Sequence, residues 1–95
     1  MVYKIKIREE ALKEWNGLDS TVRQQFTNKL KKLREYPHIP SAKLSGMPGC
    51  YKIKLRASGF RLVYQVLDDE IIIAVVAVGK RERSQAYKLA SERLR

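Results

Sequence analysis

The sequence has few of the residues that build disulfides, metal clusters or membrane spans. It contains one cysteine, Cys50, and one histidine, His38, among 95 residues. A single thiol forms neither an internal disulfide nor a metal cluster, which excludes the disulfide-rich secreted class and fits a reducing compartment. No apolar stretch approaches the length of a membrane span, and lysines interrupt the first apolar residues. We therefore expect a soluble, cytoplasmic protein.

Acidic residues are scarce relative to basic ones. The sequence contains ten Asp and Glu residues and twenty Lys and Arg residues, which gives a net charge of +10. This excess is larger than solubility requires and favours a polyanionic partner, although charge alone does not choose among nucleic acid, a ribosome and an acidic protein. The hydrophobic fraction of 44% is that of an ordinary packed globule, and the length predicts a single domain over residues 1–95.

The periodicity of apolar residues predicts an α+β fold. Alternation over residues 3–7 indicates a half-buried strand. Apolar residues at helical spacing then predict a short helix that ends near Gly17 and a second helix that begins at 19–21 and stops before Pro37. After an irregular segment, residues 51–55, 60–67 and 71–78 have the pattern of three strands in quick succession, and 85–93 that of a short helix.

This order of elements predicts a small architecture: strand, helix, helix, a three-strand meander and a C-terminal helix. We expect the helical hairpin to pack on one face of a mostly antiparallel sheet and to leave the other face free for a ligand. Residues 71–78 are apolar at nearly every position, which is typical of an inner strand.

Alternation also places several cations on one face of the sheet. If a two-residue turn at Ser58 and Gly59 joins the strands, Arg56 faces Arg61, and Lys52 and Lys54 continue the same stripe. Like charges side by side destabilise a sheet, and no acid lies among these residues. The stripe is therefore either a solvated strand surface or, as we favour, a phosphate-binding surface.

The next loop decides whether the C-terminal cations join this face. A three-residue loop over 68–70 would bring Gly79 and Arg81 onto the cationic face, whereas a two-residue loop would reverse their orientation. The placement of Arg81 thus depends on the loop length.

The residue types of this face restrict the chemistry that it can perform. RNA cleavage without a metal requires a base for the 2′-hydroxyl, stabilisation of the phosphorane charge and a proton for the leaving oxygen. His38 lies in a loop, and no carboxylate falls on the stripe. Lys54 is the natural base, because neighbouring cations lower a lysine pKa, and Arg61 suits the transition-state phosphate. No cluster of Asp and Glu has metal-ligand spacing, so we expect neither a metal nor a cofactor.

Three segments resemble the RelE toxins of bacterial toxin–antitoxin pairs: residues 51–56 (YKIKLR), 59–64 (GFRLVY) and 78–83 (VGKRER), followed by Tyr87. Residues 11–15 (ALKEW), 43–44 and 46–48 extend the similarity through nearly the whole chain. The resemblance implies a metal-independent endoribonuclease that cuts messenger RNA in the ribosomal A site. Such enzymes leave a 2′,3′-cyclic phosphate and then a 3′-phosphate.

The resemblance also assigns roles and partners. It implies that Lys54 is the general base, that Lys52 and Arg61 hold the phosphate, that Arg81 is the acid and that Tyr87 stacks on a base. From the residues alone, Tyr87 is equally an apolar anchor of the terminal helix. The resemblance further implies a RelB-like antitoxin, the small ribosomal subunit and mRNA as partners. The candidate contacts to RNA that it implies are Lys29, Lys31, Lys32, Arg34, Arg56 and Arg83.

Two other functions remain open at the level of the sequence. A ParE-type toxin of similar fold, which inhibits DNA gyrase, would not need the five candidate catalytic residues together. A non-catalytic RNA- or ribosome-binding protein would use the same charge for binding alone. Substitution of the candidate catalytic residues distinguishes these alternatives.

Overall fold

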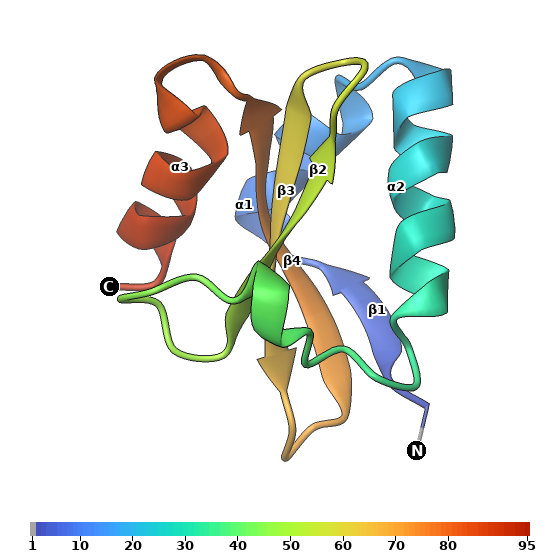
Figure 1. The fold of residues 1–95 in the computed structure, drawn as a ribbon, viewed down its shortest axis with the longest axis vertical. Helices are drawn as coiled ribbons and strands as arrows, with labels where there is room; N and C mark the ends of the chain where they lie inside the picture. The colour runs from blue at the N-terminus through green and yellow to red at the C-terminus, as the bar shows by residue number, and fades with distance from the viewer. Residues whose placement is uncertain (1) are drawn as a thin grey trace.

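The computed structural model describes residues 2–95, except for the side chain of Arg83. These residues form four strands and three α-helices, arranged as in Figure 1. The elements are β1 (Lys4–Ile7), α1 (Glu9–Asn16), α2 (Ser20–Lys32), the 3₁₀ turn η1 (Pro40–Ala42), β2 (Cys50–Leu55), β3 (Phe60–Leu67), β4 (Ile72–Lys80), the 3₁₀ turn η2 (Glu82–Ser84) and α3 (Gln85–Arg93). Across residues 2–95, no helix is both long enough and apolar enough to cross a membrane.

The four strands form one mixed sheet in the order β1-β4-β3-β2. β1 pairs with β4 in parallel, while β2, β3 and β4 form the antiparallel meander. β4 is therefore an inner strand, as its apolar sequence predicts, and every residue from Ile73 to Gly79 is buried. The predicted fold class is confirmed.

Helices α1 and α2 cover one face of this sheet. The side chain of Asp19 accepts a hydrogen bond from the Thr21 amide and caps the start of α2, as its position in the sequence predicts. Phe26 and Leu30 on α2 are almost fully buried, and they share one core with Tyr64 on β3. Large side chains therefore hold this helical layer on the sheet.

Helix α3 covers part of the opposite face. Its buried residues, Ala86 and Ala90, pack in a second core with Cys50, Val63 and Ala77 from three strands. In Figure 1, α3 and α2 lie on opposite sides of the sheet. The prediction that this face is free is therefore wrong over much of its area, because two small alanines suffice for close helix–sheet contact without an obvious apolar stripe.

The turn between β2 and β3 is longer than predicted. Leu55 pairs with Phe60, so residues 56–59 form a four-residue turn in which Gly59 has a positive φ of 77°. The predicted pairing of Arg56 with Arg61 is wrong: Arg56 lies in the turn, and Lys54 lies opposite Arg61 instead. The two-residue shift keeps every side chain on its predicted face, because side chains alternate with a period of two.

Two irregularities determine the orientation of the end of β4. Leu67 pairs with Ile72, so the turn over residues 68–71 has four residues rather than the predicted three, and Ile71 has a φ of 56°. This change alone would reverse the faces of β4. A β-bulge leaves Val76 without a partner between the Tyr64–Val75 and Val63–Ala77 pairs and restores the predicted face. Gly79 consequently lies opposite Arg61.

Candidate active site

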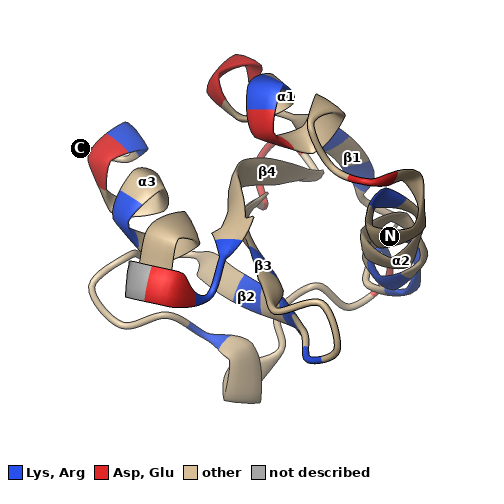
Figure 2. Cartoon of the chain, turned by 90° about the horizontal axis from the view of Figure 1, so that it is seen from above, with Lys and Arg blue, Asp and Glu red and all other residues tan. Residues whose placement is uncertain are grey.

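Cationic side chains from two strands lie on the part of the α3 face of the sheet that this helix does not cover. Lys54 pairs directly with Arg61, and Lys52 lies two residues before Lys54 on the same face. Cross-strand neighbours have Cβ atoms about 4.5–5.5 Å apart, so their charges repel at short range. Figure 2 shows these basic segments of β2 and β3 near the end of β4.

A hollow of about 230 Å³ lies beside this pair. Its lining consists of Lys54, Leu55, Arg56, Gly59, Arg61 and Arg81. Four of these six residues are cationic, and none is acidic, so the hollow suits an anion with several oxygen atoms, such as a phosphodiester. Arg56 thus contributes from the turn although it is absent from the strand stripe.

The backbone after β4 places Arg81 beside the hollow. The Arg81 amide donates a 2.8 Å hydrogen bond to the Gly59 carbonyl, which joins the end of β4 to the β2–β3 turn. A Cβ atom at Gly59 would lie 3.7 Å from Arg81 Nε, so the arginine side chain crosses the glycine in van der Waals contact. Gly59 supplies both the positive φ of the turn and this close surface.

The cations around Lys54 lower its pKa from the ordinary lysine value. Repulsion by Lys52 is the largest cause, followed by repulsion from Arg61, partial loss of hydration and repulsion from Arg56. Because a lower pKa increases the neutral fraction at a given pH, Lys54 becomes a better proton acceptor than an isolated lysine. The electrostatic basis of the predicted general base is therefore present.

Tyr87 reaches the site from α3. The guanidinium carbon of Arg61 lies 5.7 Å from the centroid of the Tyr87 ring, which is within the range of a cation–π contact. The ring also packs against the second core, while its buried hydroxyl has no hydrogen-bond partner among the described residues. Tyr87 thus anchors α3 and lies next to a cation of the site at the same time.

The basic residues of α2 fall into different environments. Lys29 and Lys32 line two further hollows together with Lys54, of about 350 and 420 Å³. Lys31 is exposed and lines neither. Arg34 donates a 2.8 Å hydrogen bond from Nε to the Tyr3 carbonyl, so it also fastens β1. The predicted RNA contact Arg83 lies outside the described side chains.

His38 lies away from this cluster. Its Nε2 atom lies 2.9 Å from an Asp68 oxygen, and Asp68 also accepts a 2.6 Å hydrogen bond from the Tyr3 hydroxyl. These contacts give His38 a structural role at the β3–β4 turn. Among the residues that the structure describes, no group of three or more His, Cys, Asp or Glu side chains could hold a metal ion.

Sequence reasoning missed the role of Gly79 in this site. A Cβ atom there would lie 3.0 Å from the Ala86 amide nitrogen and 3.1 Å from Gln85 Oε1. Glycine therefore allows the first turn of α3 to sit directly on β4, next to Arg61. A glycine within an otherwise continuous apolar strand is the only signal that the sequence offers.

Comparison with known proteins places this site in a family. Residues 5–85 match the family described as the ParE toxin of the type II toxin-antitoxin system, parDE. A RelE-like toxin protein of Escherichia coli is 70% identical over 95 residues, which cover 100% of both chains. The mRNA interferase toxin RelE of Escherichia coli K12 is 54% identical over 94 residues, which cover 99% of both.

A solved structure supports the same relationship. The toxin in the crystal structure of the intact E. coli RelBE toxin–antitoxin complex is 56% identical, with a TM-score of 0.81. The match covers 85% of this chain and 99% of that one. Identity over nearly the full length to toxins named RelE, rather than the general ParE profile alone, decides the branch. The chain belongs to the RelE toxins of the RelE/ParE superfamily, the toxin components of type II toxin–antitoxin systems.

Proposed function

We propose that this chain is a ribosome-dependent endoribonuclease that cuts mRNA in the A site and thereby inhibits translation. The observation that carries the proposal is the acid-free hollow lined by Lys54, Arg61 and Arg81, with Tyr87 against Arg61. The neighbouring cations lower the pKa of Lys54, which raises its neutral fraction, as a proton acceptor requires. The relative named mRNA interferase RelE supports the same reaction class.

The proposed reaction begins with the 2′-hydroxyl of the message. Neutral Lys54 takes its proton, and the 2′-oxygen attacks the adjacent phosphorus to form a 2′,3′-cyclic phosphate. Lys52 and Arg61 hold the phosphate oxygens, where negative charge grows in the transition state. The bond from phosphorus to the 5′-oxygen breaks, and Arg81 supplies the proton that this oxygen gains. Hydrolysis of the cyclic ester by water then gives a 3′-phosphate.

This centre is weak as a general acid–base catalyst. A guanidinium releases its proton reluctantly, so Arg81 is a poor acid, and Lys54 is a lysine in an exposed position. Substrate positioning can supply several orders of magnitude in rate, so the proposal assigns to the ribosome the alignment of the message for in-line attack. Tyr87 contributes by stacking on a base of the message. No metal ion takes part.

The cations outside the centre are the proposed contacts to RNA. Lys29 and Lys32 line hollows that share Lys54 with the centre, so they lie along the path of a bound strand. Lys31 and Arg56 are exposed and suit phosphates of the small ribosomal subunit. Arg34 and Arg83 complete the proposed set.

The proposed inhibitor is a RelB-like antitoxin. In the structure of the intact RelBE complex, a related toxin is bound to its antitoxin. A partner with acidic stretches would match the net charge of +10 and cover the hollow that the substrate needs. Ribosomal activity and inhibition by such a partner both place the chain in the cytoplasm.

The test compares purified chain on ribosome-bound message and on the same RNA without ribosomes. We expect cuts within the A-site codon, 2′,3′-cyclic or 3′-phosphate ends, and no effect of a chelator. Lys54→Ala should lower the single-turnover rate by about 10²–10⁴-fold. Lys13→Ala, which removes the same charge from an exposed position on α1 outside the proposed RNA contacts, is the matched control and should retain the rate.

Three results would contradict the proposal. Equal cleavage of naked RNA would exclude the dependence on the ribosome. Equal losses in ribosome binding for Lys54→Ala and Lys31→Ala, with no cleavage by the unaltered chain, would indicate electrostatic binding alone. Inhibition of DNA gyrase without RNA cleavage would assign the chain to the other activity of the superfamily.

A further inference from the structure

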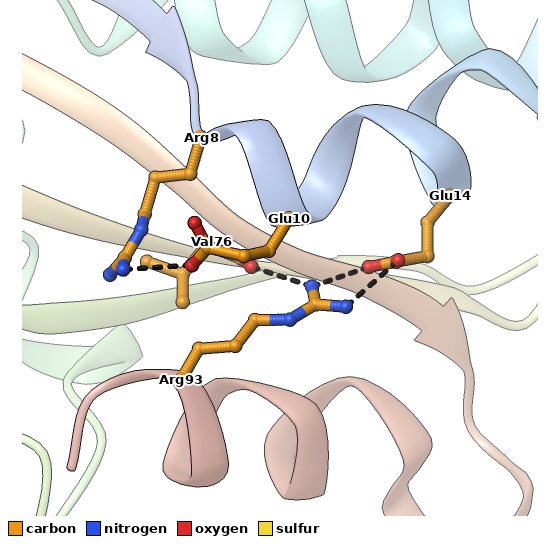
Figure 3. Close-up of polar contacts among 5 residues, drawn as sticks. All are labelled: Arg8, Glu10, Glu14, Val76 and Arg93. Carbon is orange, nitrogen blue, oxygen red and sulfur yellow. Dashed lines mark hydrogen bonds and ion pairs between the residues drawn. The ribbon is translucent and has the colours of Figure 1, made fainter.

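One partly buried arginine near the C-terminus connects three elements of the fold. Arg93 on α3 donates hydrogen bonds of 2.6 and 2.9 Å from its two terminal nitrogens to the two carboxylate oxygens of Glu14 on α1. Its Nη1 atom also donates a 2.9 Å bond to the Val76 carbonyl on β4 (Figure 3). The Arg93 and Glu14 side chains are only 16% and 22% exposed, so water screens this pair weakly.

The carbonyl that Arg93 contacts belongs to the bulge of β4. Val76 has no partner on β3, and the residues on either side of it pair in different registers. A bulge leaves its extra residue outside the regular ladder, so its carbonyl needs another donor. Arg93 provides that donor and links α3 to the irregularity that places Gly79 opposite Arg61.

This link adds to the two buried alanines of α3 and to the partly buried Leu89 and Leu94, which pack against the second core. Helix α3 has nine residues, too few for a stable isolated helix, and the buried part of its contact surface comes from Ala86 and Ala90. The backbone enters the helix through Ser84 in the left-handed region, with a φ of 50°. Small contacts and an irregular entry leave the position of α3 dependent on its C-terminal end.

We propose that Glu14 and Arg93 are positioning residues that hold Tyr87 beside Arg61. The pair fixes α3 against α1 and β4 near the end of the helix, and Tyr87 projects from its first turns to within 5.7 Å of the Arg61 guanidinium. Neither Glu14 nor Arg93 touches the substrate site. Their effect on cleavage rests on the proposed function, whereas their effect on the place of Tyr87 does not.

The test measures the position of the Tyr87 ring and the rate of RNA cleavage separately. In Arg93→Ala we expect loss of NMR contacts between the Tyr87 ring and the Arg61 side chain, together with faster amide exchange in residues 86–90. On ribosome-bound message, kcat should fall by about 10- to 100-fold, because a small misplacement of a positioning group has effects of that size. KM should change less, since the RNA-binding lysines remain.

Two variants control for a loss of folding. Arg93→Lys keeps the charge but cannot form the two-pronged contact, so it should lie between the original chain and Arg93→Ala. Glu9→Gln removes an equal charge from an exposed position at the start of α1, away from the Glu14–Arg93 pair, and should leave both readouts unchanged. Rates are compared at a temperature where circular dichroism shows each variant fully folded.

The outcomes separate this proposal from the proposed function. Unchanged contacts between Tyr87 and Arg61 in fully folded Arg93→Ala would overturn the positioning role, whatever the rate. An equal loss of contacts in Glu9→Gln would also overturn it. If the original chain cuts no RNA but Arg93→Ala still displaces the ring, the positioning role stands and the proposed function fails.

Discussion

The two faces of the sheet are built from side chains of very different size. On the face covered by α1 and α2, Phe26, Leu30, Leu62 and Tyr64 are among the largest fully buried side chains. On the face covered by α3, the core consists of Cys50, Val63, Val76, Ala77, Ala86 and Ala90. Because apolar burial scales with area, the first face supplies most of the stability. The second supplies proximity between a helix and the cationic cluster.

Removal of a large side chain from the first face should have the largest effect. Phe26 is fully buried, so Phe26→Ala should lower the free energy of unfolding by about 3–5 kcal/mol in urea titration. Leu12→Ala, on the 41% exposed Leu12, is the control and should cost much less. A loss for Phe26→Ala no larger than that of the control would contradict the division of roles between the faces.

Crowding of the second face should have a smaller effect on stability and a specific effect on the site. In Gly79→Ala the new methyl group meets the Ala86 amide nitrogen, so α3 must shift, at a cost of about 1–3 kcal/mol. Contacts between Tyr87 and Arg61 should weaken in NMR spectra. Gly17→Ala is a matched change at the end of α1. If both variants leave those contacts intact, close approach at Gly79 does not determine the place of α3.

The cations beside the second face should control the pH dependence of cleavage. Lys52 is the largest cause of the lowered Lys54 pKa, so Lys52→Ala should raise that pKa towards the ordinary value. If Lys54 acts as the base, the neutral form reacts, and the pH profile of the single-turnover rate should move to higher pH. Lys31→Ala should leave the profile in place. An unmoved profile in Lys52→Ala would exclude Lys54 as the titrating base.

The smallest effect should come from the polar contacts at the far end of the first face. The hydrogen bond from Tyr3 is the main cause that lowers the pKa of Asp68, with His38 contributing. A carboxyl with a lowered pKa adds stability above its unfolded value, near 4, and loses it as pH falls through the folded value. Asp68→Asn should therefore slightly flatten the acid limb of a stability profile. An identical acid limb in the unaltered chain and in Asp68→Asn would show that Asp68 contributes nothing to stability.

The sequence predicts the first face better than the second. The stripe of α2 and the cap at Asp19 are local patterns, and both are confirmed. The second face depends on two alanines, whose small size gives no clear stripe, and on a bulge that composition does not reveal. Arg81 reaches the predicted face only because a longer turn and a bulge compensate each other.

Part of the candidate site can likewise be predicted from the sequence, and part of it cannot. Period-two alternation places Lys52, Lys54 and Arg61 on one face without knowledge of the exact turn length, since an even shift conserves the face. The contact of Tyr87 with Arg61 requires the position of α3, and the Glu14–Arg93 pair joins residues 79 positions apart. No local pattern encodes either contact.

The bulge at Val76 divides β4 into two segments of opposite phase. Ile73 and Val75 point into the helical core, Val76 and Ala77 both point towards α3, and Val78 points back to the helical core. Regular pairing through Val76, without the bulge, would exchange the inside and outside of everything that follows. Val78 would face α3, and the segment that leads to Arg81 would leave the strand on the wrong side. The bulge at a single residue of β4 is thus as much a determinant of this toxin as the identity of its lysines.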